Sequence, residues 1–158
     1  MKKYLSLAIV STLLFLTTGC RSQNNNKTAI ASDQSQTSDK LDKIELTERT
    51  RGTNRLITFS KNKLTVNLNG NIATSPITSQ DWKSISQELS FIQLEKINTY
   101  ESPTTGRYSD AALASTIIIG IDGKIYSSLG FDSGQPPAEL KSLYNKLKKI
   151  TSVLAENK

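Results

Sequence analysis

Arg107, Tyr108 and Asp110 are the residues whose types and spacing best fit a binding site. They lie in a turn-rich stretch from residue 98 to 114, and loops of this length in small domains tend to be functional or mobile. An arginine offers planar, bidentate donors for a carboxylate or phosphate, and a tyrosine adds a flat amphipathic ring. Two structural alternatives stay open: Arg107 and Asp110 could pin the loop through an ion pair, and Tyr108 could plug an edge of the sheet.

Arg49, Arg51 and Arg55 form a second candidate surface, around a turn at Gly52. Strand alternation places Arg49 and Arg51 on one side of their strand end, with Arg55 near them across the turn. Three arginines on one rim could hold an anionic headgroup or polymer. The structural alternative is a solvated edge that discourages aggregation between strands.

The sequence contains few residues suited to catalysis. It has no histidine, and Cys20 is its one cysteine, which excludes Ser-His-Asp triads, Cys-His nucleophiles and zinc sites of the Cys/His kind. Glu101 and Asp110 are the only loop carboxylates that could act as a glycosidase pair, and nothing in their spacing fixes a geometry. No motif frames a serine with a lysine base. We therefore predict a protein that is not an enzyme and has no catalytic residues, metal or cofactor.

Strand patterns flank these candidate residues. Residues 44–48 alternate between apolar and polar, and residues 55–60 and 63–68 form the clearest hairpin, turning at Lys61-Asn62. Its apolar residues share one face and polar residues fill the other, which predicts an antiparallel sheet covered on one side only. Residues 115–121 and 124–131 form a second hairpin about Asp122-Gly123. We expect a three-residue loop there, with Gly123 in the left-handed region, because a two-residue loop would scatter the isoleucines over both faces.

Two amphipathic helices complete the pattern. The first follows Pro76, is capped by Thr78 or Ser79, and places Trp82 in an apolar stripe, so Trp82 is expected in the core. The second follows Pro136-Pro137 and carries a longer stripe, with Lys146, Lys148 and Lys149 on its solvated side. The predicted fold class is α+β, with an antiparallel sheet of about five strands and two helices on one face, in the order β-β-β-α-β-β-α. Hairpin-then-helix occurs twice, which suggests a repeat of two units side by side.

The first twenty residues have the three-part layout of a secretory signal. Lys2 and Lys3 are positive, residues 5–16 are apolar, and small residues precede Cys20. The apolar run is too short to span a bilayer comfortably as a permanent helix. The stretch Leu16-Thr17-Thr18-Gly19-Cys20 resembles the lipobox of bacterial lipoproteins, and departs from it at Thr17, where an aliphatic residue is usual.

The resemblance to bacterial lipoproteins implies that signal peptidase II cuts before Cys20 and that the thiol carries a diacylglycerol, with acyl chains such as palmitate. Each buried CH₂ of such chains contributes roughly 0.8 kcal/mol, so the anchor does not readily reverse. The expected location is extracytoplasmic. Arg21 follows the cysteine in place of a retention aspartate, which favours the periplasmic side of the outer membrane if the cell has two membranes.

Composition then divides the chain. Residues 1–19 are the expected signal peptide, residues 20–42 the lipidated cysteine with a polar, disordered tether, and residues 43–155 a single globular domain. As a flexible coil, the 22 tether residues that follow Cys20 would span roughly 25 Å. Lys and Arg number 20 against 14 Asp and Glu, a mild excess without any basic-aromatic motif, so nucleic acid is not expected as a partner.

The function predicted from these features is a membrane-tethered, extracytoplasmic lipoprotein with a small, non-enzymatic binding domain. Its partner is an envelope protein or an anionic envelope polymer. One alternative is an inhibitor of an envelope hydrolase acting through the 101–110 loop. The other is a carboxylate-dependent cell-wall hydrolase that uses Glu101 and Asp110.

Overall fold

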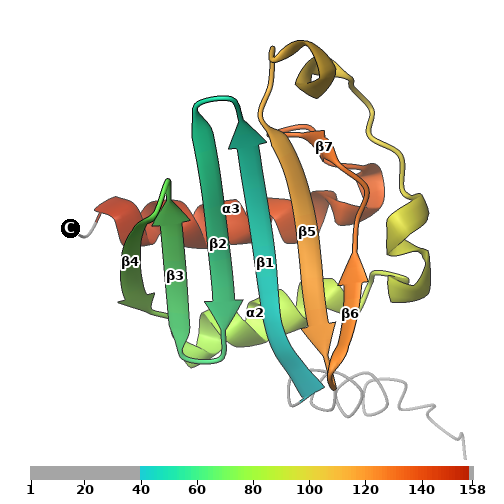
Figure 1. Cartoon of the computed structure of the whole chain (residues 1–158). Helices are drawn as coiled ribbons and strands as arrows, with labels where there is room; N and C mark the ends of the chain where they lie inside the picture. The colour runs from blue at the N-terminus through green and yellow to red at the C-terminus, as the bar shows by residue number, and fades with distance from the viewer. Residues whose placement is uncertain (1–39, 157–158) are drawn as a thin grey trace, which may run out of the picture.

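The computed structural model describes residues 40–156. This part of the chain is an α+β domain in which two α-helices cover one face of an antiparallel sheet and leave the other face open (Figure 1). The predicted fold class is therefore confirmed, although the sheet has seven strands and not about five. The predicted signal peptide, the lipidated Cys20 and the tether as far as residue 39 lie outside the described residues.

The sheet has the strand order β4-β3-β2-β1-β5-β6, and β7 pairs with β5. Its strands are β1 (Leu41–Thr50), β2 (Thr53–Ser60), β3 (Lys63–Leu68), β4 (Asn71–Pro76), β5 (Ala114–Ile121), β6 (Lys124–Ser127) and β7 (Phe131–Asp132). The helices are α2 (Ser79–Leu89) and α3 (Lys141–Glu156), with short 3-10 turns η1 (Leu94–Thr99), η2 (Gly106–Ser109) and η3 (Ala138–Leu140). No helix in this described part is both long and apolar enough to cross a membrane.

The core lies between the sheet and the two helices. The first predicted hairpin is confirmed: Ser60 pairs with Lys63 across the two-residue turn, so Ile57, Phe59 and Leu64 share the covered face. Thr78 caps α2 by accepting a hydrogen bond from the amide of Asp81 at 3.0 Å. The apolar stripes of both helices, together with Leu140 of η3, pack into the same core, with Trp82, Ile85, Leu143 and Leu147 buried. The expectation that Trp82 belongs to the core is thus confirmed.

The predicted register of the second hairpin is wrong. Ile121 pairs directly with Lys124, so the turn has two residues and not three. Asp122 and Gly123 both have positive φ, 52° and 74°, which is the conformation of the tight hairpin turns that suit Asp-Gly. As a result Ile125 lies opposite Gly120 on the open face and is 61% exposed.

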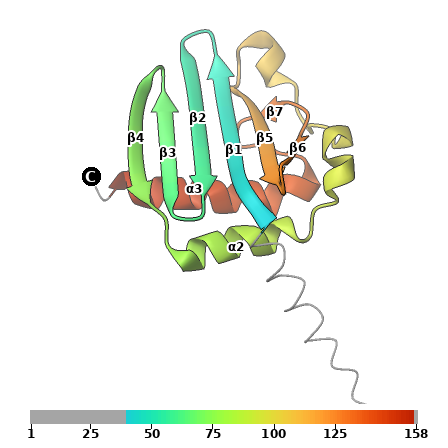
Figure 2. The same ribbon diagram turned by 60° about the horizontal axis from the view of Figure 1, so that its bottom comes forward.

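Two element boundaries and the arrangement of the hairpins also differ from the prediction. β4 is an additional strand between Gly70 and α2, and β1 begins at Leu41, which is buried, so the domain starts within the stretch assigned to the tether. The two predicted hairpin-helix units are not side by side. The two predicted hairpins correspond to β2–β3 and β5–β6, and β1 lies between them in the sheet (Figures 1 and 2).

The long strand β1 defines two ends of the domain. The Leu41 end comprises the start of β1 and the turns at residues 61–62 and 122–123. The η2 end comprises the turn at residues 51–52 and the segment from Glu101 to Asp110, which includes η2. Figure 1 shows these two groups at opposite ends of the strands. The candidate residues of the loop therefore lie one strand length away from the point where the chain enters the domain.

Candidate functional site

The loop that carries Arg107 and Tyr108 is anchored by Asp132, the last residue of β7. The side chain of Asp132 accepts hydrogen bonds from the backbone amides of Gly106 at 2.6 Å and Arg107 at 2.9 Å. A Cβ atom on residue 106 would lie 3.1 Å from the Asp132 carboxylate, so the close approach favours glycine. Asp132 is buried, at 4% exposure, and its two hydrogen bonds fix the first turn of η2 against the sheet.

Arg107 completes this anchor. Its Nη1 donates to the Thr104 carbonyl at 2.6 Å, and to Asp132 Oδ1 and Ser102 Oγ, both at 3.2 Å. Burial raises the pKa of the Asp132 carboxyl, but the hydrogen bonds from Thr104, from the two amides and from the guanidinium outweigh burial and lower the pKa to about 2. An ion pair does pin the loop, but its acid is Asp132 and not the predicted Asp110.

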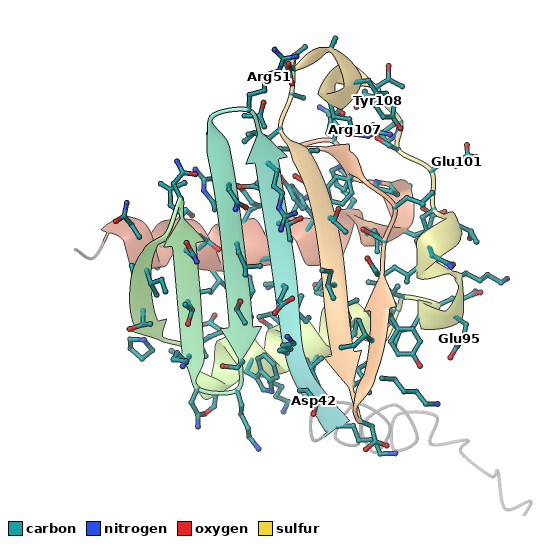
Figure 3. The ribbon with its side chains drawn as sticks, in the orientation of Figure 1. Asp42, Arg51, Glu95, Glu101, Arg107 and Tyr108 are labelled. Atoms are coloured by element: carbon teal, nitrogen blue, oxygen red, sulfur yellow. The ribbon has the colours of Figure 1, made fainter. Side chains whose placement is uncertain are left out.

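Tyr108 is exposed and nevertheless held in place. Its side chain is 77% exposed, yet Arg107 Nη2 donates to its hydroxyl at 2.9 Å, and the guanidinium carbon lies 4.3 Å from the ring centroid. Figure 3 shows Arg107 and Tyr108 together at the η2 end. Tyr108 therefore does not plug the sheet edge. It presents a fixed aromatic surface to solvent.

An open cavity of about 540 Å³ lies beside this ring. It is lined by Glu101, Ser102, Thr105, Arg107, Tyr108, Ala114, Leu129 and Gly130. Within the described chain, the Glu101 carboxylate and the Thr105 hydroxyl have no hydrogen-bond or ion-pair partner. The cavity thus offers a free acid and a free hydroxyl beside an aromatic ring and the apolar side chain of Leu129.

Asp110 is not one of the residues that line this cavity. It has a left-handed backbone, with φ of 56°, and its Oδ2 lies 2.9 Å from Arg51 Nε in an exposed ion pair. Asp110 does not line the cavity, whereas Glu101 does. The structure therefore does not bring the two carboxylates of the predicted pair into one site.

The structure does not leave the three candidate arginines of the predicted rim free on one surface. Arg51 is paired with Asp110, and Arg55 pairs in register with Glu48 on the covered face. Arg49 is offset by one residue from Glu48, so strand alternation places it on the open face. The prediction is corrected because Arg55 donates to the buried Glu48 at 2.7 Å and so turns away from Arg49.

Glu48 is the residue that sequence reasoning missed. It is fully buried, and its Oε1 accepts from Lys148 Nζ and Ser133 Oγ, both at 2.9 Å. Burial raises its pKa, but the hydrogen bond and charge of Lys148, with the hydrogen bonds of Ser133 and Arg55, outweigh burial and lower the pKa. This enclosed carboxylate links β1 to α3. Its position after Ile44 and Leu46 in the alternating strand was a signal that it faces the core.

The described residues contain no group of three or more acidic or cysteine side chains that could hold a metal ion. The fold and the cavity thus define a small α+β domain with one candidate site at its η2 end. No protein-family model, curated protein or solved structure matches this chain.

Proposed function

We propose that this chain is a lipid-anchored, extracytoplasmic binding protein whose site is the cavity beside Tyr108. The observation that supports a binding role is the continuous set of contacts from Asp132 through Arg107 to Tyr108. A buried carboxylate and a nearly buried guanidinium are used to hold an exposed aromatic ring in one orientation. Rigid tyrosines give a large contact area at low cost in conformational entropy, and aromatic residues are enriched among binding hot spots.

The charges around the cavity favour a ligand group that is neutral or cationic over an anionic polymer. Asp132 neutralises Arg107, Asp110 neutralises Arg51 and Glu48 neutralises Arg55. Arg49 is the remaining arginine of the described residues, and it does not line the cavity. Glu101 adds a free negative charge at the cavity itself. The anionic envelope polymer predicted from the three-arginine rim is accordingly the less favoured partner.

A second candidate function is the inhibition of an envelope hydrolase. The specific observation in its favour is that Tyr108 combines 77% exposure with fixation by Arg107 on a loop at one end of the domain. Pre-organised loops lose little entropy when they enter a cleft. Inhibition would require Tyr108, and inhibition assays against envelope hydrolases with the Tyr108→Ala variant distinguish this function from small-ligand binding.

Hydrolysis by the chain itself has less support. The mechanism needs two carboxylates across a cleft, at a separation of roughly 5 to 9.5 Å. Glu101 is the acid at the cavity, and Asp110 is engaged by Arg51 outside it. The proposal is therefore a binding protein and not an enzyme.

The test compares Tyr108→Ala with Phe91→Ala, an exposed aromatic outside the cavity. The two side chains are 77% and 74% exposed, so both changes should leave the fold intact. Each lipoprotein is immobilised and incubated with solubilised envelope proteins and, separately, with soluble cell-wall glycan fragments. We expect one partner to be retained by the wild type and Phe91→Ala and bound at least about tenfold more weakly by Tyr108→Ala, the loss of one central aromatic contact. Equal binding by both variants, or no partner in either fraction, would contradict the proposal.

A further inference from the structure

The two ends of the domain carry different cations. The four arginines of the described residues, Arg49, Arg51, Arg55 and Arg107, belong to the η2 end or to the strand segments beside it. The Leu41 end has lysines instead. Lys61 lies in the β2–β3 turn and Lys63 follows it, Lys124 follows the β5–β6 turn, and Lys40 precedes β1.

These four lysines form one exposed group, here termed the lysine end. All four are exposed, and none has a carboxylate partner within the described chain. The start of β1 is tied to the neighbouring turn, because the Asp122 amide donates to the Lys40 carbonyl and the Gly123 amide donates to Asp42 Oδ2, each at 3.0 Å. Figure 3 shows Asp42 at this end, opposite Arg51 and Tyr108.

The charge balance differs between the two ends. At the lysine end, four unpaired lysines face Asp42 and Asp122, an excess of two positive charges, while Lys43 is paired with Glu45. At the η2 end, four arginines and Lys148, which shares Glu48 with Arg55, face Glu48, Glu101, Asp110 and Asp132, an excess of one, and Arg49 alone among these five cations has no carboxylate partner in the described chain. Arginine suits specific, bidentate pairing, whereas lysine is a strongly hydrated point charge that suits a diffuse anionic surface.

We propose that the lysine end is a docking face for the anionic headgroups of the bilayer that carries the Cys20 anchor. Docking by this face turns the cavity beside Tyr108 away from that bilayer. The inference rests on the proposed lipid anchor, since an excess of two charges binds a membrane only weakly. The tether expected from the sequence, treated as a flexible coil of roughly 25 Å, would supply a high effective concentration, so a weak interaction is enough to orient the domain. The ligand of the cavity is then a molecule outside the headgroup layer.

The experiment measures which end of the domain approaches the bilayer. Single cysteines are introduced by Asn62→Cys at the lysine end and by Gly52→Cys at the η2 end, where a Cβ meets nothing within 4 Å. The full lipoprotein is reconstituted into vesicles of phosphatidylcholine with and without phosphatidylglycerol. Energy transfer from a thiol-linked dye to an acceptor in the headgroup layer reports proximity, because the native Cys20 thiol is acylated and does not react.

In vesicles with phosphatidylglycerol at low salt, the label at residue 62 should transfer energy more efficiently than the label at residue 52. Raising the salt should shrink the docked population about tenfold, as should neutralising the lysine end with Lys61→Gln, Lys63→Gln and Lys124→Gln. A matched control neutralises three exposed lysines elsewhere, by Lys96→Gln, Lys141→Gln and Lys149→Gln, and should leave the difference between the labels unchanged.

Equal transfer from the two labels in the anionic vesicles at low salt would overturn the inference, as would an equal effect of the two triple variants. The mass of the amino terminus is determined on the same preparation. Absence of the lipid would count against the proposed function, whereas a lipidated protein with no preferred orientation would count against the docking face alone. The two failures are therefore distinguishable.

Discussion

Among single residues, Glu48 connects three parts of the fold through one buried carboxylate. It receives hydrogen bonds from Arg55 on β2, Ser133 after β7 and Lys148 on α3. An ionised group is costly to bury unless it is paired, and here all three partners lie on different elements. The interaction therefore joins the sheet to α3 beside the segment that carries Asp132.

Replacing Glu48 with glutamine should lower the free energy of unfolding by about 2–3 kcal/mol, because two cations lose their counter-charge. The value is at the lower end for buried pairs, since Arg55 and Lys148 each keep about a third of the side chain exposed. Urea unfolding measures it. Glu45→Gln on the same strand is the control: Glu45 pairs with the more exposed Lys43, and the expected change is below about 1 kcal/mol. Equal losses in both variants would argue against a special role of Glu48.

Residue types were enough to select Arg107 and Tyr108, but not to identify what holds them. The acid that anchors Arg107 is Asp132, which is distant in the chain and reaches the loop only because β7 pairs with the start of β5. Tertiary pairing of this kind leaves no local pattern in a sequence. Glu48 differs, since its burial follows from strand alternation after Ile44 and Leu46.

At the scale of elements, the turn residues Asp122 and Gly123 determine the pairing of β5 with β6, which the hydrophobic pattern did not predict correctly. The cluster of isoleucines favoured a three-residue turn, but Asp122 and Gly123 both adopt positive φ and close a two-residue turn. The helices and the first hairpin were predictable because their periodicity and turn residues agree. The strand β4 was missed, since its sequence has only Ile72 as a large apolar residue ahead of Pro76.

Gly123→Ala should lower the free energy of unfolding by about 1 kcal/mol, because alanine is strained at a φ of 74°. Gly52→Ala is the control, since a Cβ there meets nothing within 4 Å and the backbone is not left-handed. Chemical denaturation of both variants gives the comparison. A left-handed backbone at residue 123 would be contradicted if Gly123→Ala were as stable as the wild type.

For the whole molecule, the two depressed carboxyl pKa values set the response to acid. The pKa of Asp132 falls from 3.8 to about 2, and that of Glu48 falls below 4.5. The unfolded chain therefore binds more protons than the native state in this range, so stability is present above these unfolded values and is lost as the pH falls.

The free energy of unfolding is expected to decrease steadily from about pH 5 towards pH 2. Urea titrations at several pH values measure the slope. A double variant, Glu48→Gln with Asp132→Asn, should be less stable near neutral pH and show a flatter slope, because it lacks both carboxylates. An unchanged slope in the double variant would mean that other groups carry the acid sensitivity.

We thus propose a domain that has a recognition cavity at its η2 end and is joined to a membrane anchor through its Leu41 end. Mass spectrometry of the mature amino terminus, purified from the native envelope, tests the anchor most directly. The expected chain begins at Cys20 and carries the added mass of a diacylglycerol on the thiol, with residues 1–19 removed. An intact leader, or a Cys20 without lipid, would contradict it.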